Sequence, residues 1–283
     1  MKKSQNKKKA GLTREEYIKI EPNVHLHVTD AGEGKPVVLI HGWPLSDEMY
    51  EYQYNDLINN DYRVISITLR GFGHSSKPYG LYDYDVHARD IKKVLDHLDI
   101  KKAVLGGFSM GGSIAIRYAS LYKAAHISKL ALFGAAAPIW TQRKDFPYNL
   151  QKSAVDALVE QNYKDRPKLL SDFAKIFSAT ETSLNEGIGN WLNGICLSAS
   201  SYATAKCLIA LRDTDLRKDL TKIKIPTLIM HGEQDKICSF DLAEQMKAGI
   251  SDSQLIPFEN SGHSLFLEET EKFNGALIKF AGK

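Results

Sequence analysis

Short apolar runs alternate along most of this chain with longer stretches in which apolar residues recur at helical spacing. The runs at 36–40 and 226–230 are almost continuously apolar, which is typical of strands buried on both faces of a sheet. The stretch at 85–98 shows the helical spacing instead. Strands and helices that alternate in this way favour a parallel sheet with right-handed crossover connections. The chain is therefore predicted to have an α/β fold.

The order of the predicted elements also divides the chain. An N-terminal hairpin is expected at 17–28. Further strands are expected at 36–40, 62–67, 103–105, 127–133, 226–230 and 254–257, and helices at about 46–57, 85–98, 110–122, from 240 and from 265. The alternation stops at Pro138, and until about Asp215 only amphipathic helices are indicated. We interpret 138–215 as a helical lid inserted into a core formed by 13–137 and 216–283.

The charge of the chain is concentrated at its start. Five lysines fall within the first nine residues, and without them the formal net charge of +3 becomes −2. We expect 1–12 to be a disordered basic tail and expect no nucleic-acid partner. No apolar segment follows the tail as in a secretory signal, and no apolar run is long enough to cross a bilayer. A soluble, cytoplasmic protein with no membrane partner is predicted, and its oligomeric state, a homo-oligomer included, is open.

No metal or cofactor site is indicated by the sequence. The three cysteines show neither CxxC spacing nor a neighbouring histidine cluster, so we expect reduced thiols. His25 and His27 are spaced as two metal ligands on a strand can be, but no third ligand is evident. A solvated or edge-strand face is the favoured interpretation of this pair, and no cofactor is predicted.

The segment 107–111 reads GFSMG and matches the GxSxG pattern of a nucleophile elbow. It lies where that motif must lie, between a predicted strand and a predicted helix. Glycines are needed on both sides because a Cβ atom would collide where strand and helix cross, and the helix N-terminus favours negative charge nearby. The sequence therefore predicts Ser109 as a catalytic nucleophile.

A serine nucleophile needs a base and a carboxylate that orients the base. After a GxSxG motif of this kind the partners follow in the order acid, then histidine, which leaves His126, His231 and His263. His263 lies in a loop after the last predicted strand, at the sheet edge where such sites assemble. We predict His263 as the base and His231 as a structural residue of the acid loop.

The acid is expected in the loop that follows the strand at 226–230. Asp235 is favoured over Glu233 as the residue that orients His263. The loop after the preceding strand, 134–138, offers no carboxylate.

Backbone N–H groups are expected to stabilise the negative charge of a tetrahedral intermediate. Such donors come from the residue after the nucleophile, Met110, and from the first strand-to-helix loop, at Trp43. Trp43 is also expected to line the substrate pocket together with Phe108, Trp140 and Ile237.

These motifs resemble the bacterial arylesterases and cofactor-free haloperoxidases, also called perhydrolases, of the α/β-hydrolase fold. The segments 41–44 (HGWP), 70–75 (RGFGHS) and 107–112 (GFSMGG) are similar to this family's oxyanion loop, RGxGxS loop and nucleophile segment. Pro44, directly after Trp43, is similar to the peracid-forming members, whereas Thr68 replaces the family's usual aspartate. The resemblance covers nearly the whole chain after the tail and implies a mostly parallel central sheet flanked by helices.

The resemblance and the motifs together predict a carboxylesterase that cleaves small aryl or alkyl esters through an acyl-enzyme, with a perhydrolase side activity. Two alternatives stay open at this point. The same three residues serve lactonases and carbon–carbon bond hydrolases, and a hydrolase fold can also act as a non-enzymatic small-molecule sensor. Dehalogenase chemistry is disfavoured because it needs a carboxylate in place of Ser109.

Overall fold

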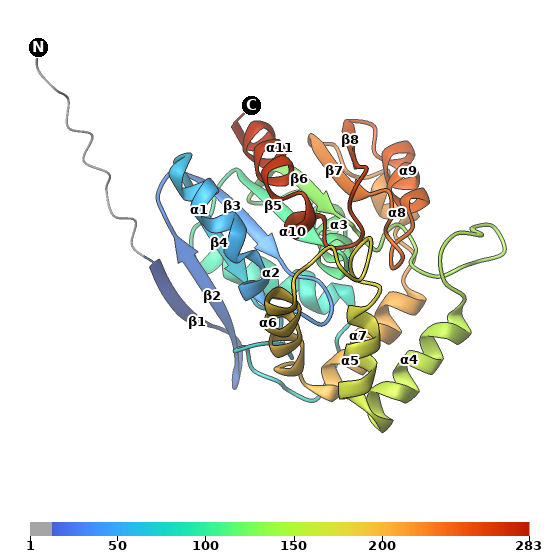
Figure 1. Ribbon diagram of the computed structural model, residues 1–283. Coiled ribbons are helices and arrows are strands. Elements are labelled where there is room, and N and C mark those ends of the chain that lie inside the picture. Colours follow the sequence, from blue (N-terminus) through green and yellow to red (C-terminus); the bar gives the residue numbers. More distant parts are fainter. Residues whose placement is uncertain (1–12, 283) are drawn as a thin grey trace, which may run out of the picture.

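An eight-stranded sheet runs through the centre of the computed structural model, which describes residues 13–282 (Figure 1). The predicted basic tail at 1–12 lies outside the described residues. The strand order is β1-β2-β4-β3-β5-β6-β7-β8. β1 (Thr13–Glu21) and β2 (Val24–Ala31) form an antiparallel hairpin, and β2 pairs antiparallel with β4 (Tyr62–Ile67).

All the other strand pairs are parallel. They connect β4 with β3 (Lys35–Ile40), β5 (Ala103–Phe108), β6 (Ile127–Phe133), β7 (Thr227–Gly232) and β8 (Ser253–Phe258). Every residue of β5 and β7 is buried, in agreement with their continuous apolar runs. The predicted mostly parallel sheet is confirmed.

Helices flank this sheet on both faces. The helices of the core are α1 (Glu51–Asn59), α2 (Tyr84–His97), α3 (Met110–Leu121), α8 (Arg217–Leu220), α9 (Phe240–Gly249), α10 (Leu265–Glu268) and α11 (Thr270–Gly282). α1 packs against α11, and α2 packs against α3. In Figure 1 the first pair lies in front of the sheet and the second behind it.

A helical insertion leaves the sheet after β6 and returns before β7. It contains α4 (Lys152–Lys164), α5 (Arg166–Ala174), α6 (Glu186–Leu197) and α7 (Ser201–Asp213) and forms the lower part of the molecule in Figure 1. Its two ends meet where the Leu216 amide donates a 2.9 Å hydrogen bond to the Pro138 carbonyl. Among residues 13–282 no single helix is both long and apolar enough to cross a membrane; α6 and α7 reach that length and composition only jointly, across a 96° bend.

Two predicted helices differ in detail from the observed ones. The helix expected at 46–57 starts as a 3-10 helix, η1 (Asp47–Tyr50), before α1 begins. The terminal helix expected from Leu265 is broken at Glu269, whose φ and ψ of −124° and 54° are not helical. At this break the carboxylates of Glu268 and Glu269 turn back and accept hydrogen bonds from the loop before α10.

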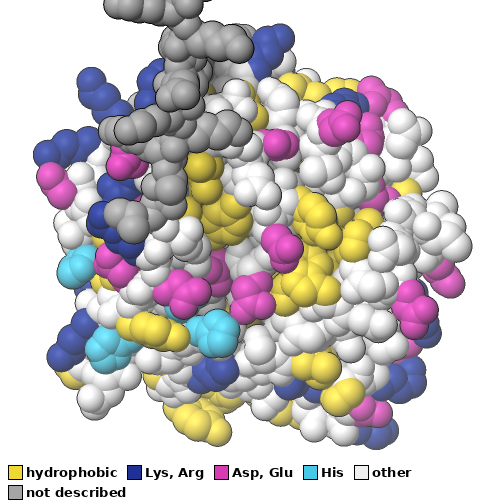
Figure 2. Space-filling model, turned by 60° about the vertical axis from the view of Figure 1, so that its left-hand side comes forward, with side chains coloured by type: hydrophobic (Ala, Val, Ile, Leu, Met, Phe, Trp, Pro, Cys, Tyr) yellow, Lys and Arg dark blue, Asp and Glu magenta, His cyan; other side chains and the backbone are white. Residues whose placement is uncertain are grey.

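Figure 2 shows histidine and acidic side chains gathered on one face of the molecule. On the hairpin, Glu15 and His27 line a hollow together with Asp47, Glu48, Glu51 and His74. His27 is only 4% exposed, so its side chain is not solvated, although it belongs to the hairpin at the edge of the sheet. Its Nδ1 lies 3.4 Å from Asp47 Oδ2, and the hydrogen-bonding interaction with Asp47 raises the pKa of His27. Thr68 also donates a hydrogen bond to Asp47. The loop around Thr68 is thus held by a carboxylate from η1.

Candidate active site

Ser109 occupies the sharp turn between β5 and α3. Its φ of +52° and ψ of −117° lie in a region that L-residues rarely adopt. A Cβ atom at Gly107 would lie 2.3 Å from the Gly111 carbonyl oxygen, and one at Gly111 would lie 2.4 Å from the Ile40 and His41 carbonyl oxygens. Strand and helix therefore cross at a distance that only glycine permits, as the motif predicts.

Asp235 and His263 meet from the loops that follow β7 and β8. The distance between His263 Nδ1 and Asp235 Oδ2 is 2.6 Å, and both side chains are almost fully buried. The other carboxylate oxygen, Oδ1, accepts 2.8 Å hydrogen bonds from the Ile237 and Cys238 amides. The carboxylate is thus fixed at both oxygens, and one of them points at the imidazole.

The ionisation of Asp235 follows from these contacts. Burial by itself would raise the pKa of the carboxyl group. The charge and hydrogen bond of His263, with smaller contributions from His231 and the Cys238 amide, outweigh burial and hold the Asp235 pKa below its usual value. Asp235 is therefore a carboxylate that accepts a hydrogen bond from His263.

The two other histidine candidates lie elsewhere. His231 Nε2 is 2.7 Å from the Cys238 carbonyl and 3.5 Å from Asp235 Oδ2, so this ring supports the acid loop. Burial lowers the pKa of His231, which leaves the ring neutral. His126 contacts the Ile100 carbonyl and Asp96, next to the start of β6. Neither ring takes the place of His263.

Two aromatic rings pack against the His263 imidazole. Nε2 is buried and has no hydrogen-bond partner within residues 13–282. The rings of Phe108 and Phe177 lie with their centroids 4.7 Å and 5.6 Å from that of His263. Phe108, expected to line the substrate pocket, is instead fully buried behind the imidazole. Its position in β5, directly before Ser109, points its ring into the core.

Glu268 holds the His263 loop in place, and the sequence did not reveal this role. Its Oε2 accepts hydrogen bonds from the Gly262 amide and the Ser264 hydroxyl at 2.9 and 2.8 Å. Its Oε1 accepts one from the Ala179 amide of the helical insertion at 2.8 Å. One carboxylate thus connects the loop to the insertion. A glutamate within a predicted helix gives no signal for such a contact.

Ser109 opens onto a cavity of about 180 Å³ between the sheet and the helical insertion. Of the predicted pocket residues, Trp43, Trp140 and Ile237 line it. Both indoles are fixed, because Trp43 Nε1 donates to the Thr204 carbonyl and Trp140 Nε1 to the Ile237 carbonyl. The sequence missed the other lining residues, which carry no motif: Leu150, Leu158, Leu169, Asp172, Phe173, Ile176, Leu208, Leu211 and Lys236.

The Trp43 and Met110 amides have no protein acceptor among the described residues. Met110 is the first residue of α3, and Trp43 lies in the loop after β3, followed by a cis peptide bond to Pro44. His41 anchors this loop, since its Nε2 accepts a 2.9 Å hydrogen bond from the Leu69 amide. Burial lowers the pKa of His41 to about 4, so the ring is a neutral acceptor at physiological pH.

Comparison with known proteins places the chain in a family. Residues 35–270 match the family model described as alpha/beta hydrolase fold. The chain belongs to this family. It is 47% identical to the AB hydrolase superfamily protein YisY of Bacillus subtilis, over 94% of this chain and 98% of that protein.

In the part of the chain that the structure describes, no group of three or more His, Cys, Asp or Glu side chains is placed to hold a metal ion.

Two solved structures are similar over almost the whole chain. An esterase from Exiguobacterium antarcticum superposes with a TM-score of 0.90 at 45% identity, covering 92% of this chain and 96% of that one. A bromoperoxidase from Bacillus anthracis superposes with a TM-score of 0.93 at 35% identity, covering 95% of this chain and all of that one. The predicted relationship to esterases and haloperoxidases of this fold is confirmed.

Proposed function

We propose that this protein is a serine hydrolase that cleaves small carboxylic esters through an acyl-enzyme. The observation that carries the proposal is the buried His263–Asp235 pair at 2.6 Å, together with a serine held in a strained elbow directly after β5. Nucleophilic catalysis by serine requires this combination. The similar esterase from Exiguobacterium antarcticum supports the same chemistry.

In the proposed reaction Ser109 Oγ attacks the ester carbonyl carbon while His263 Nε2 takes the hydroxyl proton. Asp235 stabilises the imidazolium that forms, and the Trp43 and Met110 amides donate to the oxyanion. The imidazolium then gives its proton to the leaving alcohol oxygen. Water attacks the acyl-enzyme in the second half-reaction and releases the carboxylic acid and free Ser109.

The substrate class follows from the cavity. Its walls are mostly aliphatic and aromatic, and its volume of about 180 Å³ is small. An uncharged ester with a short acyl group matches these walls, because an apolar pocket disfavours groups whose charge or polar atoms it cannot pair. We further propose that the helical insertion acts as the lid of this site, since α4, α5 and α7 form the side of the Ser109 cavity that lies opposite the sheet.

A perhydrolase side activity is part of the proposal. Hydrogen peroxide would replace water as the second nucleophile, so that the acyl-enzyme would yield a peracid and free Ser109. The Trp43–Pro44 pair and the likeness to a bromoperoxidase at 35% identity support this reaction.

Replacement of the nucleophile tests the proposal. We expect Ser109→Ala to lower kcat on p-nitrophenyl acetate by at least about 10³-fold and to abolish labelling by a fluorescent phosphonate. The matched control is Ser251→Ala, an exposed serine outside the site, which should keep wild-type turnover and labelling. Equal turnover and equal labelling of the wild type and Ser109→Ala would refute the assignment. Absent turnover together with thermal stabilisation by small esters would instead favour a ligand sensor.

A further inference from the structure

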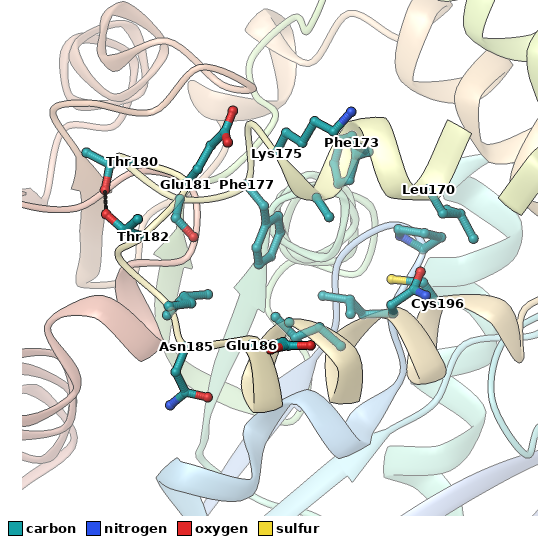
Figure 3. A pocket seen from close by; sticks show the side chains of 18 residues that line it. Leu170, Phe173, Lys175, Phe177, Thr180, Glu181, Thr182, Asn185, Glu186 and Cys196 are labelled. Carbon is teal, nitrogen blue, oxygen red and sulfur yellow. Dashed lines mark hydrogen bonds between the residues drawn. The ribbon is translucent and has the colours of Figure 1, made fainter. Parts of the chain in front are cut away.

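A second and larger cavity lies between α5 and α6, next to the one that contains Ser109. Its volume is about 560 Å³. Figure 3 shows Phe177 projecting between the two helices, with Thr180, Thr182 and Asn185 toward one end and Leu170 and Cys196 toward the other. Apolar side chains such as Leu170, Phe173 and Phe177 line the cavity.

Phe173 lines both cavities and is the side chain they share. Its ring packs edge-on against Trp43, with centroids 5.2 Å apart, and lies 6.0 Å from the ring of Phe177. The partition between the two cavities thus includes a half-buried aromatic side chain. A change of rotamer at this residue is sufficient to alter the partition without moving the backbone.

The two cavities differ in volume. Pockets for small molecules usually measure about 300–1,000 Å³. The Ser109 cavity, at about 180 Å³, lies below this range, and the larger cavity, at about 560 Å³, lies within it. An ester with more than a few carbons on each side of the carbonyl therefore needs space beyond the Ser109 cavity.

Contacts with the His263 loop indicate which half of an ester the larger cavity takes. Phe177 lines it and also packs edge-on against the His263 ring. The Phe177 carbonyl accepts a 3.0 Å hydrogen bond from the Ser264 amide, so this wall is attached to the base loop. In the proposed reaction His263 gives a proton to the leaving alcohol oxygen. The alcohol half of the substrate must therefore start on the side of His263.

We propose that the cavity between α5 and α6 is the subsite for the alcohol half of the ester, and that it accepts an apolar chain when the Phe173 ring turns away from Trp43. This inference rests on the proposed esterase function. The acyl half then stays in the small cavity beside Trp140 and Ile237. The protein is thereby specific for short acyl groups and tolerant of long or aromatic alcohols.

A glycine on α6 allows the subsite to be filled by design. Gly189 lines the cavity, and a Cβ atom there would meet nothing within 4 Å, so Gly189→Leu reduces the space without a backbone clash. Gly194, on the same helix, is equally open but exposed and lies outside the cavity lining, which makes Gly194→Leu the matched control. Both changes replace a helical glycine by a better helix former.

The measurement is the ratio of kcat/KM for octyl acetate to that for methyl acetate. We expect Gly189→Leu to lower this ratio at least fivefold and Gly194→Leu to keep the wild-type ratio. Methyl esters of increasing acyl length should show no comparable change in Gly189→Leu. An unchanged octyl-to-methyl ratio, or a loss confined to the long acyl esters, would overturn the assignment.

A binding readout separates failure of the subsite from failure of the esterase function. We expect 1-octanol to raise the Tm of Ser109→Ala by at least 2 °C and to lose this effect in the double variant with Gly189→Leu. This result would support the alcohol subsite even if no ester were hydrolysed. Equal stabilisation of the single and double variants, or none in either, would refute the subsite independently of turnover.

Discussion

Ser109 is the residue at which local strain and proposed chemistry coincide. A non-glycine residue at φ +52° costs on the order of 1–3 kcal/mol and persists only where the surroundings enforce it. The enforcing contacts are the close approach of Gly107 to Gly111 and of Gly111 to the end of β3. Backbone packing therefore sets the turn that presents the Ser109 hydroxyl.

The close crossing predicts the effect of a single added methyl group. We expect Gly107→Ala to lower the free energy of unfolding by about 1–3 kcal/mol, because its Cβ would lie 2.3 Å from the Gly111 carbonyl oxygen. Gly80→Ala, whose Cβ would meet nothing within 4 Å, should change stability by less than about 0.5 kcal/mol. Urea denaturation of both variants measures the difference, and equal effects would contradict it.

A second prediction concerns Asp235, the carboxylate proposed to orient His263. We expect Asp235→Asn to lower kcat on p-nitrophenyl acetate by about 10²–10⁴-fold with little change in fold, because an amide does not hold the imidazole in the required tautomer. Glu233→Gln, an exposed carboxylate two residues earlier, should stay within about twofold of wild type. A comparable loss in both variants would argue against the assigned role.

At the residue scale, the sequence predicted what short motifs encode. Ser109, Asp235 and His263 each lie in a loop or turn whose neighbours mark it, and the structure brings Asp235 and His263 into contact. Phe108 was misplaced because its nearness to Ser109 in the sequence was taken as nearness to the pocket, whereas every side chain of β5 is buried. Glu268 and Phe173 were not found, since their importance comes from contacts between segments about 90 residues apart and from the shape of a cavity.

At the element scale, a buried arginine joins three segments of the core. Arg70 donates through Nε and Nη2 to both carboxylate oxygens of Asp90 on α2, at 2.5 and 2.7 Å, and through Nη2 to Glu21 at the end of β1. Its side chain is 5% exposed and that of Asp90 is fully buried. The loop that carries Arg70 is thereby fixed between the hairpin and α2.

Removal of the Asp90 charge from its pair with Arg70 should lower the stability of the fold. We expect Asp90→Asn to lower the free energy of unfolding by about 3 kcal/mol, at the lower end for a broken buried pair because Arg70 keeps Glu21 as a partner. Asp96→Asn on the same helix weakens a partly exposed ion pair with Lys92 and a contact with His126, and should cost less than about 1 kcal/mol. Chemical denaturation distinguishes the two, and an equal cost would contradict the role of burial.

The positions of most elements could be predicted, whereas some of their ends could not. Apolar periodicity located β4 and β6 to the residue. The break between α10 and α11 was missed, because it depends on carboxylates that bind a neighbouring loop, while local helix propensity at Glu268 and Glu269 is favourable. Tertiary hydrogen bonds decide such boundaries.

At the scale of the whole molecule, buried neutral histidines govern the response to acid. Burial lowers the pKa of His41 to about 4 and that of His87 to about 3, and it also lowers the pKa of His231. In the unfolded chain each regains a pKa of about 6.5. Below about pH 6.5 these histidines bind protons in the unfolded state but stay neutral in the folded state, so the free energy of unfolding falls.

We therefore expect the free energy of unfolding to be at least about 2 kcal/mol lower at pH 5.0 than at pH 7.5, at constant ionic strength. His27 acts in the opposite direction, because its raised pKa adds stability below pH 6.5 that is lost as the pH rises through the raised value, but it is one group against three. Urea unfolding at the two pH values measures the change. A stability that stays constant or increases on acidification would contradict this expectation.

The helical insertion shows where sequence reasoning ends at this scale. Its presence and helical content were predicted because the strand pattern stops at Pro138 and resumes after Asp215. Its cavities were not, since they arise from the angle at which α5 and α6 pack and from side chains such as Phe173 and Phe177 that no motif marks. Amphipathic spacing predicts which face of a helix is buried, but it does not predict which cavities remain between packed helices.

The 2.9 Å hydrogen bond from Leu216 to Pro138 closes the base of the insertion. Because the insertion leaves the core at Pro138 and returns next to it at Leu216, its 77 intervening residues connect β6 with β7 as a short turn would. A segment from a related hydrolase could be grafted between the same two points, which would change the walls of the Ser109 cavity and leave the loops of Asp235 and His263 in place. Diversification of such proteins can thus proceed by exchanging one module.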